Sequence, residues 1–383
     1  MKIATIASAQ IPSTRANSIQ VMKVCQALTQ NGEECRLYVP GRRYQPWESL
    51  TRQYGLQSEF EIRWVPAWRP LRYLDFVLRA LHSAKGWKAD VVYTRMLQVA
   101  RTAAGLGFPV ILELHDLPSG KFGLVHLKKF LRASTSKQVV LITRALLALV
   151  EAQLGEAIPS AEMVIAPDGV DLERYADLPE PAAARKALNL PEKFTALYSG
   201  SFYQGRGMQM LFDLAVHFKE STFLWVGGKP YEINEWKQKI QEAQLDNVIL
   251  PGFVDNAALP LYQAAADLLL MPYSQHVAGS SGGNIANVTS PMKLFEYMAC
   301  GRAILTSDLP VLHEVLNDGN GVFCPPDDLV AWVDTIQSLA ADAPRRAHLA
   351  AQALQDVRQY SWRNRMEKII EPWKTDNKKV THG

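Results

Sequence analysis

The sequence predicts an α/β protein with two parallel sheets, each covered by helices. Short apolar runs alternate with amphipathic segments along the chain, and this alternation occurs once in each half. The chain has 383 residues, of which 48% are hydrophobic and 21% charged, an ordinary composition for a protein with buried cores. We therefore expect two domains of usual size.

The apolar runs in the first half of the chain predict one parallel sheet. Its strand candidates are apolar runs of strand length, at residues 2–7, 34–39, 91–93, 110–114, 139–142 and 163–166. Helices are expected where apolar residues recur at helical spacing, at residues 18–30, 71–83, 119–132 and 143–154.

The second half repeats the pattern. Strands are expected at residues 195–199, 222–226, 248–250, 268–271, 303–306 and 321–323. Helices are expected at residues 208–218, 233–243, 258–264, 290–299, 329–340 and 344–360.

Two prolines near the middle of the chain indicate where the two expected domains are joined. Pro179 and Pro181 bracket Glu180 in an alanine-rich stretch, a composition typical of a linker. The predicted organisation is residues 1–175, a linker at 176–190, residues 191–360, and a last helix with a tail at 361–383.

The net charge and the cysteine content argue against several classes of protein. A net charge of +3 is too mild to indicate nucleic-acid binding. The four cysteines lack paired metal spacing, so neither a zinc site nor a disulfide framework is expected. The apolar run at the N-terminus is short and is interpreted as a strand, and no apolar run has the length of a membrane span. We expect a cytoplasmic protein.

The segment Ser290–Pro310 carries the strongest functional signal. It begins with Ser290-Pro291, which predicts a capped helix start whose N–H groups can bind an anion such as a diphosphate. Glu296 follows in the same helix and can accept hydrogen bonds from ribose hydroxyls. The alternative is a solvated carboxylate on a core-facing helix.

A second element opens the later half at Tyr198–Gly207. Gly200 follows a strand, and Arg206 lies close to the next helix start, where it can neutralise a phosphate. A plain strand-to-helix turn is the alternative. Val254 follows a later strand, where its backbone can contact a base or simply form a turn.

Ser290–Ala299 resembles the donor signature of the retaining GT-B glycosyltransferases of family 4, and the resemblance extends over nearly the whole chain. It implies two Rossmann-like domains facing each other across a cleft, and a nucleotide-diphosphate sugar, UDP-linked by preference, as co-substrate without a permanent cofactor or required metal. Glu296 matches the second residue of the family's Glu-x7-Glu pair, whereas Val288 stands where the first Glu is usual. The implied donor residues are Gly200, Ser201, Arg206, Val254, Asn287, Thr289, Ser290, Met292, Lys293, Leu294 and Glu296.

The resemblance implies that the helix in residues 361–383 returns to pack on the N-terminal domain. It also places the acceptor in the N-terminal half, with candidates after strands. They are Asn17, Arg95, His115 and Arg144. Arg95 can hold an acidic or phosphorylated group in bidentate fashion. The family has a histidine at the position of His115 that approaches the donor sugar, and the catalytic set is therefore Arg206, Glu296 and His115. A purely structural role is the alternative for this histidine.

Three functions remain open at this point. The first is assembly of surface polysaccharide or glycolipid, with contact to the inner membrane face through the basic amphipathic segment 121–132. That segment is equally typical of a helix packed on a sheet. The second is a soluble synthase of a small glycoside or phosphorylated disaccharide, similar to sucrose-phosphate synthases. The third is a noncatalytic sugar-nucleotide sensor.

The glycine-rich segment 277–286 precedes the Glu296 helix. We expect donor binding to order it, with Gly282, Gly283 and Asn284 close to the sugar.

Overall fold

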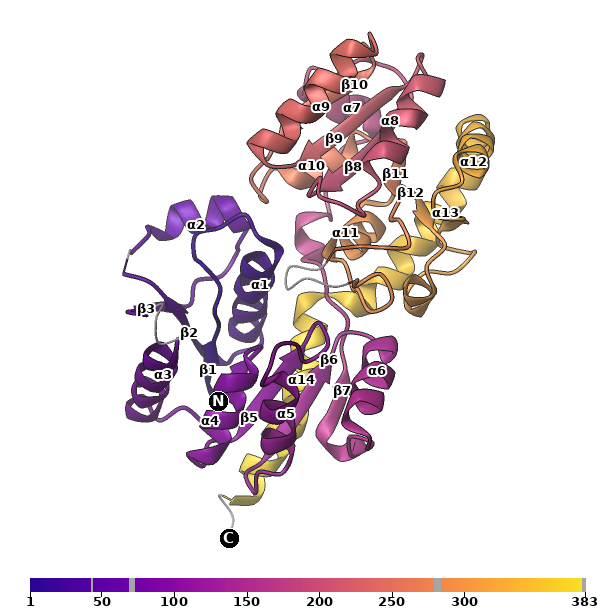
Figure 1. Ribbon diagram of the computed structural model, residues 1–383. Helices are drawn as coiled ribbons and strands as arrows, with labels where there is room; N and C mark the ends of the chain where they lie inside the picture. Colours follow the sequence, from indigo (N-terminus) through magenta and orange to yellow (C-terminus); the bar gives the residue numbers. More distant parts are fainter. Residues whose placement is uncertain (43, 69–72, 279–283, 381–383) are drawn as a thin grey trace. The chain divides into compact units, whose positions relative to one another are not determined.

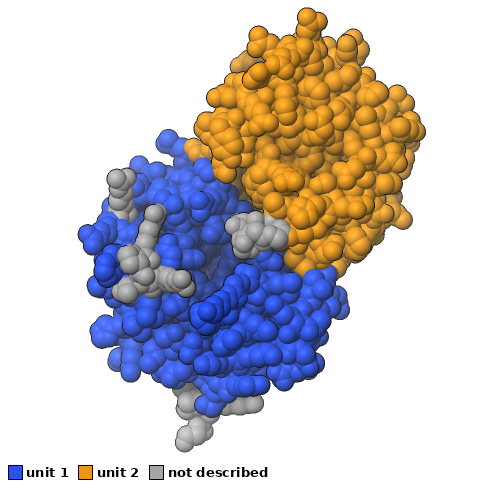
Figure 2. All heavy atoms as spheres, in the orientation of Figure 1, with its two compact units in different colours: residues 1–168, 362–383 blue, residues 169–361 orange. Residues whose placement is uncertain are grey.

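The computed structural model describes all residues except 43, 69–72, 279–283 and 381–383. It contains two compact units (Figure 2). Unit 1 comprises Met1–Asp168 and Trp362–Gly383, and unit 2 comprises Gly169–Ser361. Most of the helices and strands are labelled in Figure 1.

Unit 1 is a parallel sheet between helices. Its seven strands lie in the order β3-β2-β1-β4-β5-β6-β7. They are β1 (Lys2–Ile6), β2 (Glu34–Pro40), β3 (Glu61–Val65), β4 (Val91–Thr94), β5 (Val110–Leu114), β6 (Lys137–Leu141) and β7 (Met163–Ile165). The helices are α1 (Ala16–Gln30), α2 (Trp47–Tyr54), α3 (Leu74–Gly86), α4 (Leu97–Gly105), α5 (Gly123–Leu131) and α6 (Arg144–Leu154).

The last helix, α14 (Trp362–Val380), belongs to unit 1. It packs against α1, and the backbone oxygen of Arg363 accepts a hydrogen bond from Asn31 Nδ2 at 2.9 Å. Lys374 Nζ forms an ion pair with Glu33 at 2.9 Å, and Trp373 Nε1 donates to Gln138 Oε1. Polar contacts therefore join this distant segment to two elements of the first half.

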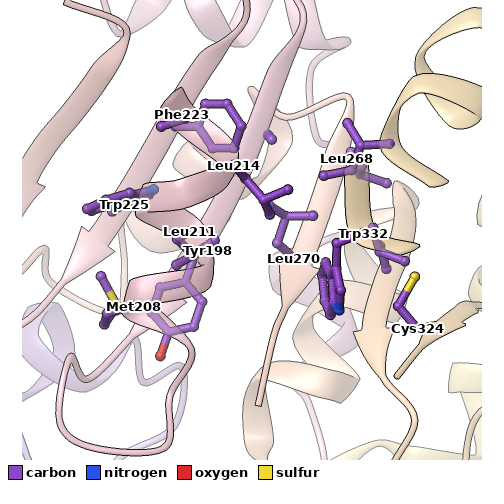
Figure 3. Close-up of a cluster of buried hydrophobic side chains, with 14 of the residues drawn as sticks. Tyr198, Met208, Leu211, Leu214, Phe223, Trp225, Leu268, Leu270, Cys324 and Trp332 are labelled. Carbon is purple, nitrogen blue, oxygen red and sulfur yellow. The ribbon is translucent and has the colours of Figure 1, made fainter. Parts of the chain in front are cut away.

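Unit 2 repeats the arrangement with six strands in the order β10-β9-β8-β11-β12-β13. They are β8 (Thr195–Gly200), β9 (Thr222–Gly227), β10 (Val248–Gly252), β11 (Leu268–Met271), β12 (Ala303–Ser307) and β13 (Val322–Cys324). The helices are α7 (Pro181–Ala187), α8 (Met208–His217), α9 (Pro230–Glu242), α10 (Leu259–Ala264), α11 (Met292–Cys300), α12 (Leu329–Ala341) and α13 (Ala343–Asp356). Figure 3 shows side chains of its core, from Tyr198 and Trp225 to Trp332.

The double parallel sheet is confirmed, and every predicted strand is present within two residues of its expected limits. Among the described residues, three α-helices and one strand were not predicted: α2, α4, α7 and β3. Edge strand β3 has the sequence Glu-Ile-Arg-Trp-Val, which lacks the continuous apolar run of a central strand. The expected linker contains α7, whose Ala184 packs against Ala264 and Ala265 within unit 2.

Two helix starts were predicted too early. α5 begins at Gly123, since Gly120 adopts φ +73°, outside the helical region. α11 begins at Met292, and Pro291, expected as its first helical residue, instead has extended backbone (ψ 124°) as the N-cap. Ser290 therefore does not cap this helix. The predicted start of the helix at residue 71 lies outside the described residues.

Candidate functional site

The order of strands identifies one edge of each sheet as the place for a ligand. In unit 2 the chain proceeds outward from β8 in one direction and from β11 in the other, so β8 and β11 flank the point where strand order reverses. In unit 1 the corresponding pair is β1 and β4. Open parallel sheets bind ligands outside the carboxyl ends of the strands at such a point.

Two cations and three tyrosines meet at this edge of unit 2. We call Tyr198, Tyr203, Arg206, Tyr273 and Lys293 the tyrosine–cation cluster. Lys293 Nζ lies 3.7 Å from the centre of the Tyr198 ring and 5.5 Å from that of Tyr273. The Arg206 guanidinium carbon lies 5.0 Å from the centre of the Tyr273 ring and 4.8 Å from that of Tyr203.

The two cations of this cluster have few hydrogen-bond partners among the described residues. Within the described residues, Lys293 Nζ and Arg206 Nε are buried and have no hydrogen-bond partner. Arg206 donates from Nη2 to the Tyr203 hydroxyl at 2.6 Å. Burial lowers the pKa of Lys293 well below its usual range, and Arg206 lowers it further, while Glu296 opposes the shift.

Glycine makes room for this arrangement. Gly200, the last residue of β8, has φ +142°, and a Cβ there would lie 2.6 Å from Lys293 Nζ. Gly207 has φ +76°, and a Cβ there would lie 1.8 Å from the Pro272 carbonyl oxygen. The predicted Gly200 and its neighbour Gly207 therefore bring backbone close to neighbouring groups.

Glu296 lies on α11 one turn beyond Lys293, on the same face of the helix. Its Oε2 accepts a hydrogen bond from Gln263 Nε2 at 3.3 Å. Gln263 is fully buried, and its Oε1 accepts a hydrogen bond from the Tyr175 hydroxyl. Gln263 therefore orients the Glu296 carboxylate. Glu296 is half-buried, so solvent still reaches it.

The other predicted donor residues surround these groups. Ser201 is exposed after β8, Val254 is half-buried after β10, and Val288 is buried with 3% of its surface exposed. The remaining residues lie at the start of α11 or just before it; Thr289, Ser290 and Leu294 are buried, Met292 is half-buried and Asn287 is exposed.

Asn287 lines a pocket of about 280 Å³ beside the same edge. Gln275, after β11, and Asp308, after β12, provide its other polar side chains. Asn284 lies close to this region, since its Oδ1 accepts from Val277 N at 2.9 Å and its Nδ2 donates to the Gln275 oxygen at 2.9 Å. Gly282 and Gly283 lie outside the described residues.

A buried ionic network occupies the corresponding region of unit 1. We call Gln20, Tyr93, Glu113, His115 and Arg365 the Glu113 network. Glu113 is fully buried in β5 and accepts hydrogen bonds from Gln20 Nε2 at 2.7 Å, from the Tyr93 hydroxyl and from His115 Nε2. Arg365 of α14 forms an ion pair with it at 3.0 Å.

Electrostatics keep Glu113 ionised. Burial acts to raise its pKa, but Arg365 and His115 outweigh this effect and bring the value to about 2. Burial and then Arg95 lower the pKa of His115, against the opposing effect of Glu113. Burial lowers the pKa of Arg95 to about 10. The imidazole of His115 is therefore biased toward its neutral form.

The structure joins two of the four predicted acceptor residues to this network. His115 contacts Glu113 directly, and Arg95 Nη1 donates to Gln20 Oε1 at 3.1 Å. Asn17 and Arg144 are exposed in the first turns of α1 and α6.

Glu113, His115 and Asp168 could together offer three metal ligands, because their ligand atoms lie within 4.8 Å of one another. The ion pair between Arg365 and Glu113 opposes a metal here, since the guanidinium already compensates that carboxylate. In the part of the chain that the structure describes, no helix is both long and apolar enough to cross a membrane.

Sequence reasoning missed the tyrosines of the tyrosine–cation cluster, Gln263, Glu113 and Arg365. Tyr198 and Glu113 lie inside apolar strands, where they look like core residues. The Glu-Leu-His pattern of β5 was a usable signal, because residues two apart on a strand share one face.

Comparison with known proteins decides the family. The description "Glycosyltransferase Family 4" matches residues 18–174, and "Glycosyl transferases group 1" matches residues 193–342. The chain belongs to the GT-B glycosyltransferases of family 4. The α/β fold with two Rossmann-like units is the GT-B fold.

Solved GT-B structures show the same fold over almost the whole chain. The Anabaena protein HepE in complex with UDP has a TM-score of 0.73 at 17% identity, covering 98% of this chain and 100% of that one. A sucrose-phosphate synthase from Thermosynechococcus elongatus has a TM-score of 0.74 at 18% identity, with 98% and 99% covered.

Curated relatives of this GT-B chain match over shorter spans. A D-inositol 3-phosphate glycosyltransferase of Xylanimonas cellulosilytica is 29% identical, covering 52% of this chain and 48% of that protein. An alpha-galactosylglucosyldiacylglycerol synthase of Streptococcus pneumoniae is 24% identical, with 60% of each chain covered. The chain thus spans between about half and 60% of the length of these relatives.

Proposed function

We propose that the protein transfers a sugar from a nucleotide-diphosphate sugar to an acceptor hydroxyl, with unit 2 binding the donor and unit 1 the acceptor. The observation that carries this proposal is a pair of buried nitrogens, Lys293 Nζ and Arg206 Nε, that have no hydrogen-bond partner within the described part of the chain. They lie where an open parallel sheet binds its ligand, with Glu296 one turn further along α11.

The chemistry follows from charge development on the departing diphosphate. Arg206 and Lys293 stabilise that charge in a buried setting, where a fixed cation is worth far more than in water. Removal of one such group typically costs about 3–4 kcal/mol of the barrier. Glu296 accepts hydrogen bonds from the ribose hydroxyls and thereby orients the nucleotide. Transfer proceeds with retention at the anomeric carbon, as the family pattern implies.

The pocket of Gln275, Asn287 and Asp308 replaces the contact that a glutamate at Val288 would make. Its three polar side chains supply donors and acceptors suited to sugar hydroxyls, and its volume of about 280 Å³ is sufficient for a hexose ring. Asn287→Ala should raise the KM for the donor sugar by about tenfold, the equivalent of about 1.4 kcal/mol, with an unchanged Kd for the nucleoside diphosphate alone.

A uridine donor is supported by the UDP bound to the Anabaena neighbour of the same fold. The direct test is a thermal-shift panel of UDP, GDP and ADP, because a ligand at about 100 times its Kd stabilises the folded state by about 2.7 kcal/mol. If none of the three nucleotides stabilises the protein, the proposed function is overturned.

Glu296→Ala should weaken binding of the stabilising nucleotide while the protein remains folded. The matched control is Glu235→Ala, which removes an exposed carboxylate from α9 of the same unit. If Glu296→Ala binds the nucleotide as tightly as the control variant, Glu296 is not the ribose ligand.

We further propose an acceptor that is part of a glycolipid or polysaccharide carrier. The relatives named for diacylglycerol and inositol 3-phosphate support this class, and Arg95 supplies a half-buried guanidinium for a phosphate. On α5 and beside it, Phe122 and Val125 are exposed by 50% and 45%, together with the exposed cations Lys121 and Lys129.

This exposed face suits contact with anionic lipid. The doubly substituted variant Phe122→Ser/Val125→Ser should lose binding to vesicles containing anionic lipid. Val216→Ser, which replaces an apolar residue exposed by 40% in unit 2, should retain it. Equal binding by both variants would favour the alternative acceptor, a soluble sugar phosphate like that of a sucrose-phosphate synthase. A noncatalytic sensor would be excluded by slow hydrolysis of the donor.

A further inference from the structure

In the described residues, neither cation of unit 2 is hydrogen-bonded to a carboxylate. Like charges repel strongly at low dielectric, and a buried cation normally has a carboxylate or several hydrogen bonds. In the described residues Lys293 Nζ has no hydrogen-bond partner, and Arg206 Nη2 donates to the neutral Tyr203 hydroxyl. Some other interaction must offset their burial.

The tyrosine rings provide that interaction. Lys293 Nζ lies 3.7 Å from the centre of the Tyr198 ring, close enough for strong attraction to its π face. Tyr273 lies between the two cations, 5.5 Å from Lys293 Nζ and 5.0 Å from the Arg206 guanidinium carbon. Both rings are fully buried.

The Tyr198 ring is held by a hydrogen bond and by core packing. The Tyr198 hydroxyl donates to the Ser201 carbonyl oxygen at 2.7 Å, across the turn that follows β8. Its ring packs within the core of unit 2, and Figure 3 shows the hydroxyl pointing away from Leu211 and Leu214. Packing of the ring in this core defines where its face meets the lysine nitrogen.

We propose that Tyr198 and Tyr273 are positioning residues of the donor site, whose ring faces hold the charges of Lys293 and Arg206 in place for a diphosphate. This inference rests on the proposed function. A carboxylate partner would stabilise the cations by neutralising them and would repel the incoming phosphates. A ring face attracts each cation and leaves its net charge unchanged, so the diphosphate meets two charges that are already oriented.

The experiment compares removal of the ring with removal of the hydroxyl alone. Tyr198→Leu and Tyr273→Leu remove the π face, whereas Tyr198→Phe and Tyr273→Phe keep it. Phe223→Leu is the matched control, because it removes a buried ring from β9 in the same core (Figure 3). Affinities for UDP and uridine are measured by calorimetry on the full chain, with circular dichroism to confirm folding.

The Kd for UDP should rise about tenfold in both leucine variants, and the Kd for uridine should stay unchanged, since the nucleoside lacks the diphosphate. The phenylalanine variants and Phe223→Leu should bind UDP within about twofold of the wild type. If one leucine variant does not fold, the other gives the same comparison.

Three results would overturn the inference: wild-type affinity for UDP in a folded leucine variant, an equal loss in the phenylalanine and leucine variants, or an equal loss in Phe223→Leu. Each of these outcomes leaves the proposed function standing, provided that the wild type binds UDP. Failure of the wild-type protein to bind any nucleoside diphosphate is a separate result, which contradicts the proposed function itself.

Discussion

At the scale of residues, two groups in unit 2 have unusual surroundings for their type. Lys293 is a buried cation over a tyrosine ring, and Gly200 has a backbone conformation that places it against the lysine nitrogen. Each depends on the other, because the lysine occupies the space that a side chain at Gly200 would need. Substitutions of Lys293 and of Gly200 therefore test the donor site directly.

The affinity for UDP should fall as pH rises through the lowered pKa of Lys293. Burial and Arg206 lower the pKa of Lys293, whereas a bound diphosphate raises it, so binding is accompanied by proton uptake above the lowered pKa. Tyr198, Tyr273, Arg206 and Glu296 are the charged or titratable groups that face Lys293. Calorimetry at pH 8.5 in two buffers of different ionisation enthalpy measures the uptake, and Lys293→Met should abolish it.

Gly200→Ala should both destabilise unit 2 and weaken nucleotide binding. The residue has φ +142°, which strains any L side chain by about 1–3 kcal/mol, and the new Cβ would displace Lys293 Nζ. Gly105→Ala is the control, because a Cβ at this position in α4 meets no atom within 4 Å. Thermal melts and the Kd for UDP measure the two effects; an unchanged Kd would show that the lysine position is not critical.

At the scale of elements, α14 connects the C-terminal segment to the candidate acceptor region of unit 1. Arg365 reaches Glu113 in β5 at 3.0 Å and also donates from Nε to the Pro167 oxygen at 2.7 Å. A helix from the end of the chain thus supplies the charge that keeps a buried carboxylate ionised. That carboxylate in turn contacts His115.

Arg365→Met should lower the free energy of unfolding by about 3–5 kcal/mol, since it leaves Glu113 buried without its main counter-charge. Arg363→Met, an exposed position on the same helix, should have little effect. Denaturant melts of the full chain measure the difference. Adding Glu113→Gln to Arg365→Met should recover part of the loss, and absence of recovery would contradict the pairing.

The pairing of Arg365 with Glu113 also predicts that the stability of the protein decreases at low pH. The pKa of Glu113 is lowered from 4.5 to about 2 in the folded protein, so its stabilising contribution is present above about pH 4.5 and is lost as pH falls toward 2. Stability measured across this window should decrease more steeply in the wild type than in Glu113→Gln. Parallel curves would exclude Glu113 as the responsible group.

At the scale of the whole molecule, two units of similar architecture carry different chemistry at the same edge of their sheets. Unit 2 has cations paired with rings, which suit a ligand of high negative charge, whereas unit 1 has a compensated ionic network around a histidine. This division fits a donor unit and an acceptor unit.

Sugar transfer should proceed equally well after treatment with EDTA. The two cations of unit 2 supply the positive charge that a metal ion provides in other phosphate sites, and Arg365 already compensates the acidic group of unit 1. The measurement is the rate of nucleoside diphosphate release with EDTA and with added Mg²⁺ or Mn²⁺. A rate that requires the metal would contradict the proposed mechanism.

The sequence by itself determined the two parallel sheets and nearly all the strand positions. It also grouped Arg206, Lys293 and Glu296 in one expected donor site, and the first two lie near the same Tyr273 ring. Apolar runs and glycine-bounded turns are local features, and they can be recognised without knowing what packs against them. It did not reveal α2, α4 or α7, which have only 8, 9 and 7 residues, because helices this short have little stability of their own.

Only the tertiary structure decided which buried polar groups meet. Tyr198 and Tyr273 come from strands or strand ends 75 positions apart, and Arg365 reaches Glu113 across 252 positions of chain. Inside an apolar run, a tyrosine or a glutamate has the same sequence signature whether it faces a cation or the core. The physical reason is that burial and charge pairing depend on three-dimensional neighbours, which local periodicity does not contain.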